Sequence, residues 1–236
     1  MSFHTGIPVA RVSADARVQY LQKVLLITAF GLGLSGITGM VSAAGIALVP
    51  GLLSGYAPML LILGCWAVTN YVARPMVFGA AKWPGFFIGT IAQGVAMGFL
   101  LLVAMLVSRA EFGNPFVFIG VAMAMTGFTG VGMAAYVWTG PKNFSMIGAG
   151  LSAMAIPMMI LMAVSFGFPG LFGGTFGLVM SFVFVGISAA GLLYQVNEVI
   201  HRFSTDQHVE AAYTITIGVL VLFWNLLSLL MRLRRR

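Results

Sequence analysis

The chain has 236 residues, of which 60% are hydrophobic and 7% are charged, and its mean hydropathy is +1.04. A soluble domain carries about 25% charged residues, and the long uncharged runs lack the ten-residue alternation of barrel strands. The composition therefore excludes a soluble globular protein and predicts an all-α, polytopic membrane helical bundle. The net charge of +7 does not indicate a nucleic-acid partner, because the basic residues flank apolar stretches, where they orient membrane helices.

Seven apolar stretches are long enough for transmembrane helices, since a span needs about 20 apolar residues. In chain order they are residues 21–49, 56–72, 86–107, 115–138, 144–168, 175–200 and 211–231. No cleavable signal is expected, because the first stretch is long, follows a polar segment and lacks a small-residue cleavage site. The connections are short and no linker divides the chain. We expect a single integral membrane domain over residues 1–236, with a polar lead-in at 1–20 and a basic tail at 232–236.

The first stretch carries small residues at four-residue spacing, which let membrane helices approach closely. They are Gly31, Ser35, Gly39 and Ala43. Similar pairs occur later, at Gly130 and Ala134, Gly148 and Ser152, and Gly186 and Ala190. We expect these residues to pack helices within one bundle, in preference to forming a dimer interface.

The cysteine and the methionines are better explained by packing than by a disulfide or a metal site. The single cysteine, Cys65, lies in the second stretch and excludes an internal disulfide or a cysteine-based metal site. The fifth stretch gathers four methionines that would suit a copper-type path. Methionine is more often an adaptable packing residue, so we favour packing for Met154, Met158, Met159 and Met162.

The basic residues predict the orientation, because Lys and Arg are enriched on the cytoplasmic side. With seven spans, those before the tail fall on one side, except Arg109. This predicts a cytoplasmic N-terminus. The tail then lies outside, against the rule, unless the seventh stretch is re-entrant, and both alternatives stay open. The N-terminal side holds Arg11, Arg17, Lys23, Arg74, Lys82, Lys142 and Arg202, and the tail holds Arg232, Arg234, Arg235 and Arg236.

No predicted span holds a catalytic site. Intramembrane catalysis needs a nucleophile with a base, paired acids or metal ligands, and none lies at depth, so we expect no enzyme activity and no cofactor. The loop before the seventh stretch gathers His201, Asp206, His208 and Glu210, which could bind a divalent ion. Their spacing fits no compact metal motif, and we favour a solvated loop without a metal.

A polar cluster closes the sixth stretch, in the sequence GLLYQVNEVIHR. Gln195, Glu198 and Arg202 fall on one helical face, and the last two form a favourable i,i+4 pair. Polar groups at membrane depth usually have a partner, and the natural one is Asn225 in the seventh stretch. Two interpretations stay open: a solvated helix end with an ordinary ion pair, or a polar plug that forms half of an ion site. Asn197 completes the cluster, with Arg74 and Tyr213 as further hydrogen-bonding candidates.

Four segments occur in an informative order and spacing: RVQYLQKVLLITAFGLGLSGITGMVSA, KNFSMIGAGLSAM, FVGISAAGLLYQVNEVI and NLLSLLMRLRRR. Together they resemble the Bax inhibitor-1 proteins (the TMBIM family), in their bacterial YccA-like branch. The resemblance implies a seven-helix bundle whose last helix is surrounded by the other six. It also implies a role in membrane stress or ion homeostasis rather than catalysis, since bacterial relatives are associated with calcium leak and with modulation of a membrane protease.

The resemblance also points to a site. In the family, an aspartate on the sixth helix pairs with one on the last helix, and the pair acts as a latch sensitive to protons and calcium. Here the first aspartate falls on Gln195 and the second on Leu222, while Tyr194 and Asn225 are kept. Glutamine and leucine cannot titrate. The resemblance therefore implies a divergent member that lacks the di-aspartyl latch.

These observations favour a non-enzymatic integral membrane protein that regulates or binds a membrane partner, such as a protease or a larger complex. The expected location is the bacterial inner (plasma) membrane, with lipid contact along the apolar helices. One alternative is a pH-insensitive leak channel or small transporter for a cation such as calcium. The other is a structural subunit of a larger membrane complex.

Overall fold

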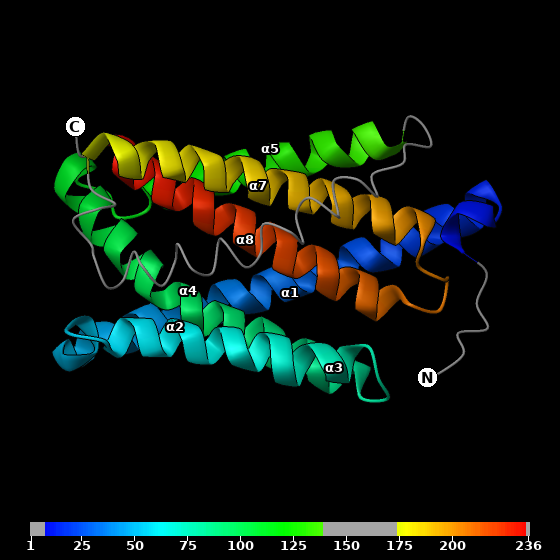
Figure 1. Cartoon of the computed structure of the whole chain (residues 1–236), viewed down its shortest axis with the longest axis horizontal. Coiled ribbons are helices and arrows are strands. Elements are labelled where there is room, and N and C mark those ends of the chain that lie inside the picture. Colours follow the sequence, from blue (N-terminus) through cyan, green and yellow to red (C-terminus); the bar gives the residue numbers. More distant parts are fainter. Residues whose placement is uncertain (1–7, 139–173, 235–236) are drawn as a thin grey trace. The chain divides into compact units, whose positions relative to one another are not determined.

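The computed structural model describes residues 8–138 and 174–234 (Figure 1). Within these ranges the chain is almost entirely helical, and β pairing is limited to an isolated bridge between Pro8 and Ser204. The predicted fifth stretch at 144–168 lies outside the described residues, together with its methionines, Lys142, and the pair Gly148 and Ser152.

The helices follow the predicted stretches in chain order. They are α1 (Ala14–Leu48), α2 (Ala57–Ala67), α3 (Arg74–Val77), α4 (Lys82–Phe112), α5 (Val117–Trp138), α7 (Gly174–His201) and α8 (His208–Arg234). The 3-10 turns η1 (Val9–Arg11) and η2 (Pro50–Leu53) flank α1, and the π turn η3 (Val68–Ala73) joins α2 to α3. Within residues 8–138 and 174–234, five helical segments are long and apolar enough to cross a membrane: Asp15–Leu48, Ala57–Val77, Lys82–Phe112, Phe176–His201 and His208–Leu233. The prediction of an all-α membrane bundle is confirmed.

Several helix ends extend beyond the predicted apolar stretches. Helix α1 begins at Ala14, where Oγ of Ser13 accepts a hydrogen bond from the Ala16 amide at 3.4 Å. The end of the expected polar lead-in is therefore helical. Arg74, which follows the second predicted stretch, lies in α3, and α8 begins at His208, before the predicted seventh stretch. The reason is physical: helix caps and first turns favour polar residues, so a hydropathy boundary falls inside the helix.

The chain forms two compact units, which are described separately. Unit 1 comprises residues 1–103 and 198–220, and unit 2 comprises residues 104–197 and 221–236. The core of unit 1 draws on η1, α1, η3, α3, α4 and both sides of the connection from α7 to α8. Its buried members are Val9, Tyr20, Val24, Ala73, Val77, Phe86, Val199, Phe203, Val209, Ala211, Ala212 and Tyr213. The expectation of a single domain stays a prediction.

Helices α1 and α4 pack closely within unit 1. Oγ of Ser35 donates to the Thr90 carbonyl at 2.8 Å, and Oγ of Ser42 donates to the Val95 carbonyl at 3.0 Å. A Cβ added at Gly39 would lie only 3.2 Å from the Gly94 carbonyl oxygen. The stripe from Gly31 to Ala43 therefore packs one bundle, as predicted. A Cβ added at Gly130 or Gly186 would meet no described atom within 4 Å, so these two glycines make no such close approach within the described residues.

The π turn provides a buried hydrogen-bond acceptor for α8. The hydroxyl of Tyr213 donates to the Thr69 carbonyl at 3.0 Å. The tyrosine ring lies over Gly89 of α4, where an added Cβ would come within 2.5 Å of Cε2. Tyr213 therefore joins the start of α8 to both η3 and α4, and it fixes the position of the first turns of α8 in unit 1.

In unit 2, a tight turn links α4 to α5. Gly113 has a φ of 71°, a left-handed conformation that favours glycine. Oδ1 of Asn114 accepts a hydrogen bond from the Phe116 amide at 2.9 Å, and Oγ of Ser108 donates to the Asn114 carbonyl at 2.7 Å. Further along, the α8 residues of this unit bury a leucine-rich face that includes Leu222, Leu226, Leu227 and Leu229.

Candidate functional site

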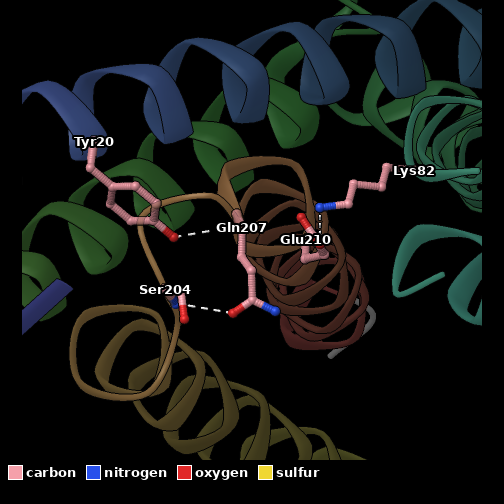
Figure 2. A network of polar contacts seen from close by, with 5 residues as sticks. All are labelled: Tyr20, Lys82, Ser204, Gln207 and Glu210. Atoms are coloured by element: carbon pink, nitrogen blue, oxygen red, sulfur yellow. Dashed lines mark hydrogen bonds and ion pairs between the residues drawn. The ribbon is translucent and has the colours of Figure 1, made fainter. Parts of the chain in front are cut away.

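A polar network in unit 1 surrounds the connection from α7 to α8 (Figure 2). Its charged members are Glu210, in the first turn of α8, and Lys82, the first residue of α4. Oε1 of Glu210 lies 2.7 Å from Nζ of Lys82, and the side chains are 1% and 32% exposed, respectively. Burying a carboxylate is expensive unless a partner compensates its charge. Lys82 therefore acts as the counter-ion of Glu210.

The connection has its own internal hydrogen bonds. The Ser204 amide donates to Oε1 of Gln207 at 3.0 Å, and the Gln207 amide donates to the Ser204 carbonyl at 3.0 Å. The hydroxyl of Tyr20 in α1 donates to the Gln207 carbonyl at 3.4 Å, as Figure 2 shows. The Ala211 amide donates to the same carbonyl at 3.0 Å. These bonds place Glu210 at the amino end of α8, where the helix dipole favours a negative charge.

The carboxylate of Glu210 has few polar contacts besides Lys82. The residue is 0% exposed, and within the described part of the chain neither of its oxygens accepts a hydrogen bond. Its neighbours in sequence, Val209, Ala211 and Ala212, are buried in the apolar core. The site is thus a charge pair with an apolar surround rather than a hydrated acidic pocket.

The chain also has a recognisable sequence family. A family model described as "Inhibitor of apoptosis-promoting Bax1" matches residues 17–235. The chain belongs to the Bax inhibitor-1 family. The match includes all five residues of the network in Figure 2, and it also includes the two latch positions, Gln195 and Leu222. Searches of the curated proteins and of the solved structures find no match.

In this Bax inhibitor-1 family member, part of the predicted polar cluster is an ordinary ion pair. Glu198 and Arg202 lie 3.6 Å apart as an i,i+4 pair at the end of α7, with side chains that are 29% and 56% exposed. The predicted pair is confirmed. Because both groups reach solvent, its contribution is small, about 0.3–0.5 kcal/mol. For these two residues, the solvated helix end is the better interpretation.

The predicted hydrogen bond between Gln195 and Asn225 is wrong. Nδ2 of Asn225 donates instead to the Val221 carbonyl of its own helix at 3.0 Å. Oε1 of Gln195 is buried and has no hydrogen-bond partner among the described residues. Of the other candidates, Tyr213 bonds to η3, Arg74 is exposed, and Asn197 is buried in α7.

The two positions that the resemblance assigns to the latch lie in unit 2. Leu222 is 1% exposed, so hydrocarbon fills the position that the resemblance assigns to the second aspartate. At the first position, the buried amide oxygen of Gln195 carries no charge. Neither side chain can exchange a proton near neutral pH.

The expected solvated loop is wrong for Glu210, which is buried in α8. No group of three or more His, Cys, Asp or Glu gathers into a metal-binding set in residues 8–138 and 174–234. The sequence did contain a signal for the helical position of Glu210, because acidic residues are enriched in the first turn of a helix. Its pairing with Lys82, like the roles of Tyr20, Ser204 and Gln207, depends on tertiary contacts that no local pattern encodes.

Proposed function

We propose that this Bax inhibitor-1 family member is a non-enzymatic integral membrane protein that regulates or binds a membrane partner, such as a protease or a larger complex. We also propose that its proton and calcium latch is lost. One observation carries the proposal. Within the described residues, Glu210 is the acidic side chain that is buried, and Lys82 already balances its charge.

The physical argument rests on where a cation could bind. A cation path through a membrane protein usually needs acidic or polar side chains that face a cavity and can replace water around the ion. In unit 1 the ammonium of Lys82 occupies the position next to Glu210 that a metal cation would take. In unit 2 the latch positions offer the amide of Gln195 and the hydrocarbon of Leu222. These features favour a binding or regulatory role over conduction.

The contacts at one end of unit 1 support the proposed orientation in the bacterial inner membrane. The Val9 amide donates to the Phe203 carbonyl at 3.0 Å, the rings of Phe78 and Phe203 lie 6.3 Å apart, and Nη2 of Arg17 donates to the Ala10 carbonyl at 2.9 Å. These contacts bring the start of α1 together with the ends of α3 and α7, and the ion pair of Lys82 with Glu210 joins the start of α4 to the start of α8. A cytoplasmic position of this end follows the positive-inside rule, because it carries Arg11, Arg17, Arg74, Lys82 and Arg202.

Two measurements test the proposal together. The full chain, purified in mild detergent, should bring a membrane protein with it in a fixed ratio. The purified chain in liposomes should pass calcium no faster than protein-free liposomes do. Purification without any partner, combined with calcium flux clearly above that background, would contradict the proposal. A constant multi-subunit assembly without a regulated activity would favour the structural-subunit alternative.

The partial exposure of Lys82 is the observation that favours the leak alternative. Lys82 is partly exposed, so its ammonium could leave the carboxylate to a cation. The variant Lys82→Met tests this directly in liposomes. Calcium flux that rises in this variant and falls back to background in Lys82→Met with Glu210→Gln would favour a leak through Glu210. Flux that stays at background in both variants supports the partner-binding proposal.

A further inference from the structure

We propose that the Lys82–Glu210 ion pair is a releasable lock that fastens the first turn of α8 to the start of α4 in unit 1. The pair joins an almost fully buried carboxylate to a partly exposed ammonium across 2.7 Å. The two side chains differ in how easily they reach water when the pair breaks. Lys82 can extend its long side chain into water, whereas Glu210 reaches water only if the start of α8 moves.

The α4 side of the lock is fixed. A Cβ added at Gly85, one turn after Lys82, would lie 2.6 Å from the Val77 amide nitrogen and 2.8 Å from the Ala73 carbonyl oxygen. The backbones of α3 and α4 are therefore in direct contact, and the next residue, Phe86, is fully buried. Since α4 cannot shift toward α3 here, release of the lock involves the Lys82 side chain alone on this side.

On the α8 side, the turn from Ser204 to Gln207 and the first turn of α8 form one connected segment. Ser204 and Gln207 bond to each other, so the turn before α8 has internal bonds of its own, and η1 is bonded to it from the Val9 amide to the Phe203 carbonyl. Its bond to α1, from the hydroxyl of Tyr20 to the Gln207 carbonyl, measures 3.4 Å (Figure 2), which is long for an O–H donor. The turn and the start of α8 therefore open together, and this opening also breaks the bonds from Tyr213 to Thr69 and from Val9 to Phe203.

The buried charge makes the pair a lock rather than an ordinary surface contact. When Lys82 leaves, Glu210 remains as an uncompensated charge among buried apolar residues, which is strongly unfavourable. Hydration of the carboxylate then requires the turn and the first residues of α8 to open. The paired state therefore keeps this region closed, and the unpaired state favours its opening.

Amide hydrogen exchange on the full chain in detergent tests the lock, because exchange reports local opening. In Lys82→Met, amides of residues 204–213 should exchange on the order of a hundredfold faster, given the penalty for a buried unpaired charge. In Glu210→Gln they should change little, because the remaining lysine can reach water. The double variant Lys82→Met with Glu210→Gln should return close to the original protein.

The control is Arg202→Met, which removes the partly exposed ion pair to Glu198 and should leave exchange of residues 207–213 unchanged. Equal acceleration by Glu210→Gln and Lys82→Met, or no acceleration by Lys82→Met, would overturn the lock. If Lys82→Met does not fold, folding of the double variant supports the proposal, and failure of both overturns it. The inference does not depend on the proposed function, because it concerns the opening of unit 1 and not a partner or an ion flux.

Discussion

At the scale of single residues, Tyr213 occupies a slot that glycine leaves open at position 89. A Cβ at Gly89 would lie 2.5 Å from Cε2 and 2.8 Å from the hydroxyl of Tyr213. We expect Gly89→Ala to reduce the free energy of unfolding by about 1–3 kcal/mol, as overpacking of a buried site does. The thermal midpoint in detergent measures this. Gly36→Ala is the matched control, since an added Cβ there meets no described atom within 4 Å, and a comparable drop in both variants would contradict the slot.

The proposed loss of the latch gives a second prediction at the residue scale. Gln195 and Leu222 carry no titratable group, so any calcium flux in liposomes should change little between mildly acidic and neutral pH. The resemblance pairs these two positions, so in Gln195→Asp with Leu222→Asp we expect the two carboxylates to titrate in a coupled way and pH dependence to appear. A steep pH response in the unmodified protein would mean that another group, such as Glu198, Glu210 or a histidine, acts as the latch.

At the scale of helices, α1 and α4 are joined by side-chain hydroxyls as well as by close backbone approach. Ser35 and Ser42 each donate to a carbonyl of α4. Polar contacts between membrane helices average about 0.6 kcal/mol each. The double variant Ser35→Ala with Ser42→Ala should therefore lose about 1 kcal/mol, visible as a small drop in the thermal midpoint. A loss several times larger would show that these hydroxyls do more than join two helices.

Local sequence patterns predicted the helices better than their ends. Apolar runs of about 20 residues placed the spans, since membrane helices must match the bilayer. The starts of α1 and α8 were placed too late because their first turns are polar. The stripe from Gly31 to Ala43 was read correctly. The same spacing at Gly130 and Gly186 marks no close approach among the described residues, because spacing alone does not say which helix lies opposite.

The candidate site was predicted only where its contacts are local. The pair of Glu198 and Arg202 lies one turn apart on one helix, so the spacing sufficed. Lys82 and Glu210 come from distant parts of the chain, and no local sequence pattern around either residue indicates that the two form a pair. The bond expected between Gln195 and Asn225 failed for a related reason: an amide in a helix can bond to the carbonyl one turn before it, as Asn225 does.

At the scale of the whole molecule, the topology can be tested with reporter fusions. The start of α1 lies at the end of unit 1 that carries five basic residues, Arg11, Arg17, Arg74, Lys82 and Arg202, and Lys82 is the first residue of α4. We expect fusions after Arg17 and after Ala81 to read cytoplasmic, in line with the positive-inside rule. A periplasmic signal from either position would reverse the proposed orientation.

A third fusion, after Arg232, addresses the basic tail. The segment His208–Leu233 has 26 residues and is apolar enough to cross, so a crossing with seven spans places the tail outside. A re-entrant α8 would return it to the cytoplasm. Together with the fusion after Arg17, which gives the side of the N-terminus, the reporter at this position distinguishes the two arrangements.

The contacts between η1, α1 and the α7–α8 connection have a consequence for biosynthesis. Val9 bonds to Phe203, and Tyr20 bonds to Gln207, so the earliest helix is completed by segments that the ribosome makes late. At about 5–20 residues per second, α1 waits on the order of ten seconds or more for these partners. During that interval the nascent chain exposes Val9 and Tyr20, and a chain interrupted before Ser204 never covers them. Membrane quality control would meet such fragments as unfinished proteins, even though their first helices are already inserted.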